Sequence, residues 1–286
     1  MRNHRGFTII ELMIALVVML VVSAGIFKLM NGTQRLSRAQ AERVDLQSNV
    51  RTAALYIPNE LRELNTIVGG AADRNDIVVA GAGTVRFRAM RGIGFVCQSS
   101  GTEIRVNAVT YTGTRAPQAP PRDAAYVFVQ GASITADSWL QVVYTALSTA
   151  NTCPNGNAAY TLTVPAMTAA TVGTPVRFYE VVELSVYVTD GKPWLGARSV
   201  SAGEVNPQPV LGPLRATAGT QTGLDFKYYD GTGAETAVLA NIKSVQVRIW
   251  GETTQRIAGS GGGTASSSFV QDSLVTQVSL RNSFRP

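Results

Sequence analysis

The feature that most constrains this chain is a long apolar run at its amino end. Residues 12–27 contain no charged side chain, and residues 7–10 just before them are apolar apart from one threonine. The whole segment, interrupted only by Glu11, reaches the length of about 20 residues that an α-helix needs to cross a bilayer. No second segment of this kind occurs in the sequence, so we expect at most one membrane span. Arg2 and Arg5 precede the run and predict a cytoplasmic amino end.

Three interpretations of this amino end compete. The simplest is an uncleaved signal anchor. The second is a secretory signal peptide cut after the small-residue site Val22-Ser23-Ala24. The third is a short leader that is cut between Gly6 and Phe7 on the cytoplasmic side of the membrane. The three interpretations differ in whether they give a role to Glu11, the one acidic residue in the run.

Glu11 favours the third interpretation. A carboxylate inside an apolar span costs about 2.5–3.5 kcal/mol on insertion scales, and neither an anchor nor a signal peptide has a use for it. Cleavage after Gly6 creates a free α-amino group on Phe7. In a stack of related helices, that ammonium group can pair with Glu11 of a neighbour, which offsets the cost of burial and fixes the axial register. We therefore expect Phe7 and Glu11 to form a subunit-pairing contact.

The same residues carry a family resemblance. The segment RGFTIIEL at residues 5–12, followed by the apolar run, resembles the cleavage and methylation signature of type IV prepilins. The resemblance implies cleavage between Gly6 and Phe7 by a prepilin peptidase/N-methyltransferase, followed by N-methylation of Phe7. It also gives Glu11 the fifth position of the mature chain. The partners that it implies are this enzyme, the inner membrane, and other major and minor pilins or pseudopilins.

A single helix is expected to continue beyond the membrane. Lys28 marks the far edge of the span, and apolar residues then recur at three- and four-residue steps, as one stripe of a helix. The stripe consists of Leu46, Val50, Ala53, Ile57, Leu61 and Leu64. The pattern predicts a helix from residue 7 to about residue 65, with a kink or a brief break at Pro58. Either the stripe packs on this chain's own sheet, which we favour because a β-rich segment follows, or it forms a free coiled coil.

From residue 76 onward, the hydrophobic period changes to the period of two that is typical of strands. The candidate strands are residues 77–80, 84–90, 95–98, 103–111, 125–129, 139–146, 160–164, 176–189, 225–229, 242–250 and 274–281. No long helical pattern returns. The predicted fold class is therefore α+β and pilin-like, with a long amino-terminal helix packed on a large antiparallel β body. So many strands form either one strongly curved sheet or two sheets.

The patterns and the resemblance together give the expected domain organisation. Residues 1–6 are the leader, residues 7–30 the transmembrane or filament-core part of the helix, residues 31–66 its periplasmic half, and residues 67–286 the β-rich body. The body is expected in the periplasm before assembly, while the helix anchors the chain in the inner membrane. After assembly, the chain is expected in a pilus or pseudopilus.

The late part of the chain refines the resemblance. YYDG at residues 228–231, IKSVQVRI at residues 242–249 and VSLRN at residues 278–282 are similar to the end of one minor-pilin group. That group contains the W-type minor pilins of type IV pili and the J-type minor pseudopilins of type II secretion. The resemblance implies a minor subunit that helps to prime or form a type IV pilus. A J-type pseudopilin is the first alternative, and a pilus-tip adhesin or DNA-binding module is the second.

Cys97 and Cys153 are the only cysteines. The resemblance places both outside the cytoplasm, where disulfides persist. A bridge between them would close a loop of about 56 residues and stabilise the fold by about 4 kcal/mol in the chain-entropy model. The alternative is a pair of independent thiols.

The sequence offers little for catalysis or metal binding. The only histidine, His4, lies in the expected leader, so the mature chain would have no Ser-His or Cys-His pair and no histidine ligand. Two cysteines are too few for a cysteine-based zinc site. The segment DGTGAE at residues 230–235 has the composition of a hairpin turn and lacks the ligand spacing of a calcium loop. We expect no catalytic residue, no metal, no cofactor and no enzyme activity; a membrane-tethered enzyme with a histidine-free site is the alternative.

Four arginines lie close together in the sequence: Arg86, Arg88, Arg91 and Arg105. They could hold the phosphates of DNA, and the formal charge of +6 is compatible with an anionic partner without identifying one. The other interpretation is the polar face of a half-exposed sheet, with Val85 and Phe87 facing inward. We favour the sheet because no aromatic stacking series or nucleic-acid motif accompanies the arginines.

Overall fold

The computed structural model describes residues 8–65, 75–130, 138–165, 170–216, 222–258 and 267–280. The chain divides into two compact units, one of residues 1–48 with 252–271 and one of residues 49–251 with 272–286. The smaller unit holds the amino-terminal part of the long helix and a two-stranded hairpin. The larger unit holds the end of that helix and nearly all of the other strands.

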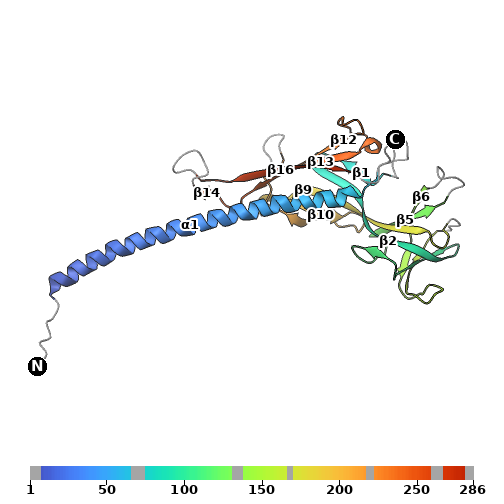
Figure 1. The fold of residues 1–286 in the computed structure, drawn as a ribbon, viewed down its shortest axis with the longest axis horizontal. Helices are drawn as coiled ribbons and strands as arrows, with labels where there is room; N and C mark the ends of the chain where they lie inside the picture. Colours follow the sequence, from blue (N-terminus) through green and yellow to red (C-terminus); the bar gives the residue numbers. More distant parts are fainter. Residues whose placement is uncertain are drawn as a thin grey trace, which may run out of the picture. The chain divides into compact units, whose positions relative to one another are not determined.

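Helix α1 (Ile9–Arg62) is continuous over 54 residues, or about 81 Å at 1.5 Å per residue (Figure 1). Of the two expectations for Pro58, a kink or a brief break, the break was wrong, because the helix passes through this residue and ends only at Arg62. The kink stays a prediction. Pro58 cannot donate the hydrogen bond that a helix makes to the residue four positions earlier. Its neighbours Ile57 and Leu61 are nevertheless completely buried, and their packing holds the last turn in helical form.

The apolar stripe of α1 packs on the strands of the larger unit. Ala53, Ile57 and Leu61, with Leu64 just beyond the helix end, are completely buried. They belong to one hydrophobic core with residues of several strands, including Val247. The expected packing of the helix on the chain's own sheets is confirmed, and the free coiled coil is excluded for this part of α1.

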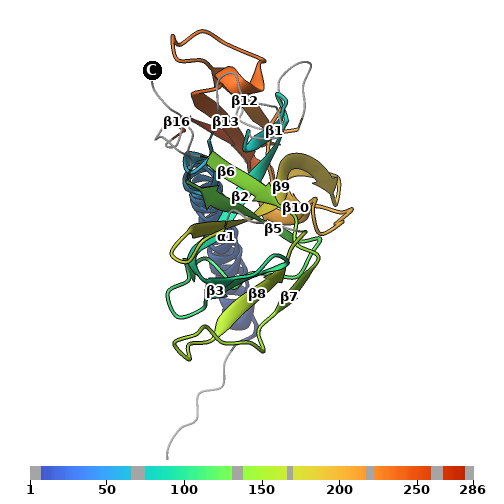
Figure 2. The ribbon, with the colours of Figure 1, turned by 90° about the vertical axis from the view of Figure 1, so that its right-hand side faces the viewer.

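The main sheet has eleven strands, and its paired strands are antiparallel. They are β1 (Ile77–Ala80), β2 (Thr84–Ser99), β3 (Glu103–Asn107), β4 (Thr112–Gly113), β5 (Asp123–Val129), β6 (Ser138–Val142), β7 (Ala146–Ser148), β8 (Ala159–Thr163), β9 (Pro175–Thr189), β10 (Lys192–Ser199) and β11 (Gln208–Leu211). The central order is β11-β10-β9-β2-β3-β8-β7. Strands β1 and β4 also pair with β2, while β5 joins β9 to β6. Figure 2 shows β3, β8 and β7 side by side.

The longest strands differ in one respect from the sequence prediction. Residues 84–90 and 95–98 were expected as two strands, but both belong to β2. The register between β2 and β9 shifts between Met90 and Gly92. A shift of this kind lets a strand change its local direction without ending, which is why the interruption in the pattern did not mark a strand end.

Among the described residues, two smaller sheets accompany the main sheet. Strands β12 (Leu224–Tyr229), β13 (Ser244–Glu252) and β16 (Gln271–Ser279) form a three-stranded sheet in the order β12-β13-β16. Strands β14 (Ile257–Ala258) and β15 (Ser267–Ser268) form a two-stranded hairpin, and a short 3-10 helix η3 (Leu239–Asn241) precedes β13. The body is therefore built from more than one sheet, and the expected α+β class is confirmed.

The described residues of the larger unit form two hydrophobic cores that share strand β9. Val182 and Leu184 belong to the core under the helix, whereas Val176 and Phe178 belong to a second core lined by β3, β5 and β8. Because side chains alternate along a strand, all four point to the same face of the sheet. Glu180 occupies the position between them on that face, so a carboxylate separates the two apolar cores.

We refer to Glu180, Arg91, Arg115 and Arg122 as the Glu180 cluster. Glu180 is 3% exposed. Its Oε2 accepts hydrogen bonds from Arg91 Nε at 2.9 Å and from Arg115 Nη2 at 3.0 Å, and Arg122 Nε lies 3.0 Å from its Oε1. Arg91 Nη1 also lies 3.4 Å from Glu60 Oε2 on α1. The cluster thus connects β2 and β9 with the last turns of the helix.

Candidate functional site

The amino-terminal part of α1 exposes an apolar surface along its whole length. The most apolar 18-residue window of the helix has a mean hydropathy of 2.7, and the described chain buries none of it. Its side chains are exposed at both ends of the segment, by 81% at Ile9 and by 68% at Phe27. A contiguous apolar surface of this size indicates contact with a membrane or with other protein chains. We therefore take this surface as the candidate functional site.

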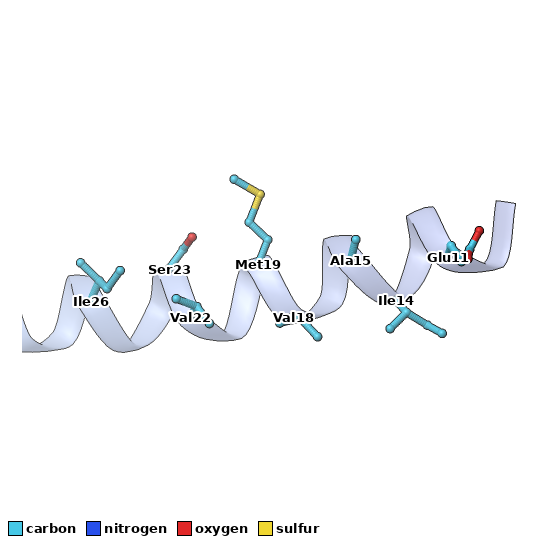
Figure 3. Close-up of a pocket in the computed structure, with 8 residues that line it drawn as sticks. All are labelled: Glu11, Ile14, Ala15, Val18, Met19, Val22, Ser23 and Ile26. Carbon is cyan, nitrogen blue, oxygen red and sulfur yellow. The ribbon is translucent and has the colours of Figure 1, made fainter. Parts of the chain in front are cut away.

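Figure 3 shows how the side chains of this surface lie on the helix. They form two adjacent rows in which residues follow one another at four-residue steps. The first row is Glu11, Ala15, Met19 and Ser23, and the second is Ile14, Val18, Val22 and Ile26. The small side chains of Ala15 and Ser23 leave a shallow hollow beside their larger neighbours. Small residues of this kind allow two helices to approach closely inside a membrane or a filament core.

Glu11 closes the first turn of α1. Its Oε2 accepts hydrogen bonds from the backbone N–H and from the hydroxyl of Thr8, both at 3.0 Å, while Thr8 Oγ1 accepts one from the Glu11 N–H at 3.4 Å. This reciprocal arrangement is a capping box, which satisfies backbone donors that a helix start leaves without partners. The carboxylate also lies at the positive end of the helix dipole. Glu11 therefore stabilises the start of its own helix.

The capping role was missed in the sequence, although the spacing T-x-x-E that signals it was visible at residues 8–11. The hydrogen bonds that Glu11 accepts from Thr8 both go to Oε2. Among the described residues, Glu11 Oε1 receives no hydrogen bond. This oxygen remains available to an ammonium group from outside the described part of the chain.

Gly6 and Phe7 lie outside the described residues. Cleavage between them, N-methylation of Phe7 and the pairing of Phe7 with Glu11 therefore stay predictions. The described structure shows that α1 begins at Ile9 and that its capping residue is Thr8. An amino group created on Phe7 would thus stand immediately before the helix cap.

The two cysteines come together in the larger unit. Cys97 on β2 and Cys153 in the segment between β7 and β8 form a disulfide, with Cα atoms 5.7 Å apart and a sequence separation of 56 residues. The bond ties one end of the longest strand to a segment near the second core. The disulfide is not part of the apolar surface of α1, and it cross-links two segments of the β body.

The four arginines singled out in the sequence have partners within the protein. They contact Glu183 (from Arg86, 2.6 Å), the Asn75 carbonyl (from Arg88), Glu180 (from Arg91, 2.9 Å) and Glu103 (from Arg105, 3.7 Å). Val85 and Phe87 are completely buried, as the interpretation of a half-exposed sheet requires. These contacts give no support to a phosphate-binding patch for DNA on β2.

The segment at residues 230–235 forms a turn after β12. Asp230 Oδ1 accepts hydrogen bonds from Thr232 N at 2.8 Å, Thr232 Oγ1 at 2.7 Å and Ala234 N at 3.0 Å. The carboxylate is thus used to hold the turn together. Across the described ranges of the chain, no three His, Cys, Asp or Glu side chains gather as a metal site would require.

Comparison with known families gave a match that lies at the amino terminus. Residues 1–27 match the model of the prokaryotic N-terminal methylation motif. No curated protein and no solved structure matches the chain. The matched segment and the exposed apolar helix that follows it support a type IV prepilin-like protein.

Proposed function

We propose that this chain is a minor structural subunit of a type IV pilus. The observation that carries the proposal is the exposed apolar part of α1, whose first turn is closed by the Thr8–Glu11 capping box within the methylation motif. Such a helix can be covered in two places, by the inner membrane before assembly and by neighbouring helices in a filament core afterwards. The β body then faces the outside of the filament.

The proposed pathway has three steps. A prepilin peptidase removes residues 1–6, and the new amino group of Phe7 is methylated. The chain is held in the inner membrane by α1, with its amino end cytoplasmic and its body periplasmic. On assembly, the amino group of Phe7 pairs with Glu11 of a neighbouring subunit, through the oxygen that the Thr8 cap leaves open. The chain itself performs no chemistry and is the substrate of the processing enzyme.

The minor role is supported by the late body segments. Residues 228–231, 242–249 and 278–282 are those that resemble W-type minor pilins. Residues 242–249 lie largely in β13 and contribute side chains to the core that also contains α1 residues. A minor subunit of this kind would select its neighbours through its body and help to prime the filament. The same segments and the same amino terminus also fit a J-type minor pseudopilin of a secretion system, which is the second candidate.

Genetic deletion separates these two candidates. Loss of twitching motility or DNA uptake with normal enzyme secretion supports a type IV pilus. Loss of enzyme secretion with normal twitching supports a pseudopilus. A DNA-binding tip module is disfavoured because the arginines that suggested it are engaged inside the protein.

The proposal itself is tested by the intact mass and amino-terminal sequence of the protein recovered from its own cells. A chain that starts with N-methylated Phe7 supports a processed filament subunit. A chain that starts at Gly25 would be an ordinary secreted protein, and an intact Met1 would be an uncleaved anchor. Either of the last two results refutes the proposal.

A further inference from the structure

The smaller unit contains a groove that the proposed assembly role does not use. It has a volume of about 420 Å³, and it lies between α1 and the segment that leads into strand β14. The positively charged side chains that line it are Arg35, Arg38 and Arg256. Glu42 is the single acidic residue of its lining. Three arginines and one acidic residue therefore line the same groove.

The carboxylate of Glu42 is occupied by the hairpin segment. Its Oε2 accepts hydrogen bonds from Thr254 N at 2.7 Å and from Gln255 N at 3.3 Å, and its Oε1 accepts one from the Thr254 hydroxyl. These bonds fix the residue before Arg256 against the helix. Among the described residues, none of the three arginines makes an ion pair with Glu42 or with another acid.

Arg256 is held in place from a second side. Its guanidinium carbon lies 5.3 Å from the centre of the Phe269 ring. The hairpin base is closed by the hydrogen bond from Thr253 N to the Val270 carbonyl at 3.0 Å. Arg256 is thus positioned by the hairpin rather than by a negatively charged partner. Positive charges this close together repel one another, and a bound anion would offset the repulsion by accepting hydrogen bonds from them.

The groove lies just beyond the apolar part of the helix. Residues 9–30 span about 33 Å, which matches a hydrocarbon layer of about 30 Å. Arg35 then lies about 7 Å and Arg38 about 12 Å further along the helix axis, near a headgroup layer that is about 5–7 Å thick. Helical side chains point back toward the amino end, so both arginines reach toward the membrane.

We propose that this groove binds the phosphate of an anionic phospholipid headgroup while the helix is in the membrane. The inference rests on the proposed membrane insertion of α1 and adds to it a specific lipid contact. Arginine suits this ligand because its planar fork donates two parallel hydrogen bonds to phosphate oxygens. The bound headgroup would set the depth of the helix and hold the hairpin close to the membrane surface.

The experiment is native mass spectrometry of the full-length chain in detergent, titrated with phosphatidylglycerol. The groove variant is Arg35→Gln/Arg38→Gln/Arg256→Gln, and the control is Arg43→Gln/Arg51→Gln/Arg62→Gln, which removes the same charge outside the groove. We expect the wild-type chain and the control to retain the lipid, and the groove variant to bind it about 100-fold more weakly, at about fivefold for each arginine. Near-ultraviolet circular dichroism verifies that both variants fold.

Three further binding measurements identify the ligand. Phosphatidylcholine, which carries a phosphate but no net charge, should bind more weakly than phosphatidylglycerol. A triple lysine variant of the same three positions, which keeps the charge but loses the guanidinium fork, should bind with intermediate affinity. Displacement of the lipid by millimolar inorganic phosphate would overturn the assignment to a lipid, because the groove would then take free phosphate.

Two other results would overturn the proposal. One is equal loss of lipid in the groove variant and in the control, which would show a general charge effect. The other is unchanged lipid binding together with reduced cross-linking between subunits in the groove variant, which would assign the groove to an acidic side chain of a neighbour. The intact mass of the same samples shows whether the chain begins at Phe7, so failure of the lipid site is distinguished from failure of the proposed function.

Discussion

Replacing Glu180 by glutamine should destabilise the protein in a pH-dependent way. Burial alone would raise the pKa of this carboxyl, but hydrogen bonds from Ser199, Arg91 and Arg115 outweigh burial and lower the pKa to about 2. The difference from the ordinary value of 4.5 corresponds to about 3 kcal/mol of stability from the charged form. Removal of one partner from a buried ion pair costs a similar 3–5 kcal/mol.

The direction of the pH effect follows from the lowered pKa. Because the folded protein holds Glu180 ionised more strongly than the unfolded chain does, its contribution is fully present above pH 4.5. The contribution is lost as the pH falls toward 2. The Glu180→Gln variant should therefore lose about 3 kcal/mol at pH 7, and the difference from the wild type should shrink steadily below pH 4.5.

The assay is urea unfolding of the full-length chain in detergent, followed by tryptophan fluorescence, at a series of pH values. All three tryptophans lie in the larger unit, which also contains the Glu180 cluster. Glu235→Gln is the matched control, because its pair with Lys227 is exposed and solvent screens such a pair, so its loss should change the stability little. The reasoning is refuted if Glu180→Gln costs no more than the control at pH 7, or if its cost is the same at pH 7 and near pH 3.

Three further predictions concern the disulfide, the helix packing and the assembly contact. The double variant Cys97→Ser/Cys153→Ser should lose about 4 kcal/mol of unfolding free energy, measured in urea without reductant, and an unchanged midpoint would contradict this. Leu61→Ala should lose about 2–5 kcal/mol in the same assay, whereas truncation of the 74% exposed Leu55 should have little effect; equal losses would show that the stripe does not pack as described. Glu11→Gln keeps a side chain that can cap the helix but removes the charge, so processing should persist while incorporation into filaments falls, and normal incorporation would argue against the ion pair.

Glu11 has two roles: it caps the helix start in the structure, and it is expected to contact a neighbouring subunit. Burial of the Glu11 carboxylate in an apolar run is costly, and this cost predicts a contact with a neighbouring subunit. The contact involves Phe7, which lies outside the described residues. The same carboxylate also closes a local hydrogen-bond pattern with Thr8. The T-x-x-E spacing predicts the local pattern, whereas the subunit contact requires a second chain.

The sequence alone determined the elements that depend on local pattern. The length of the apolar run, the helical stripe from Leu46 to Leu64 and the period of two after residue 76 each predict one kind of secondary structure, because hydrophobic spacing reports directly on which face is buried. The stripe is buried as expected, from Leu46 to Leu64. The methylation motif was also readable, since it is a contiguous segment.

Only the tertiary structure decided the features that join distant parts of the chain. Helix α1 continues through Pro58 because packing of its neighbours compensates for the missing hydrogen bond. Glu180 lies between two apolar cores and meets arginines from separate segments. Arg256 lines a groove with Arg35, more than 200 residues away along the chain. Such juxtapositions depend on strand order and on long-range packing, and no local period in the sequence records them.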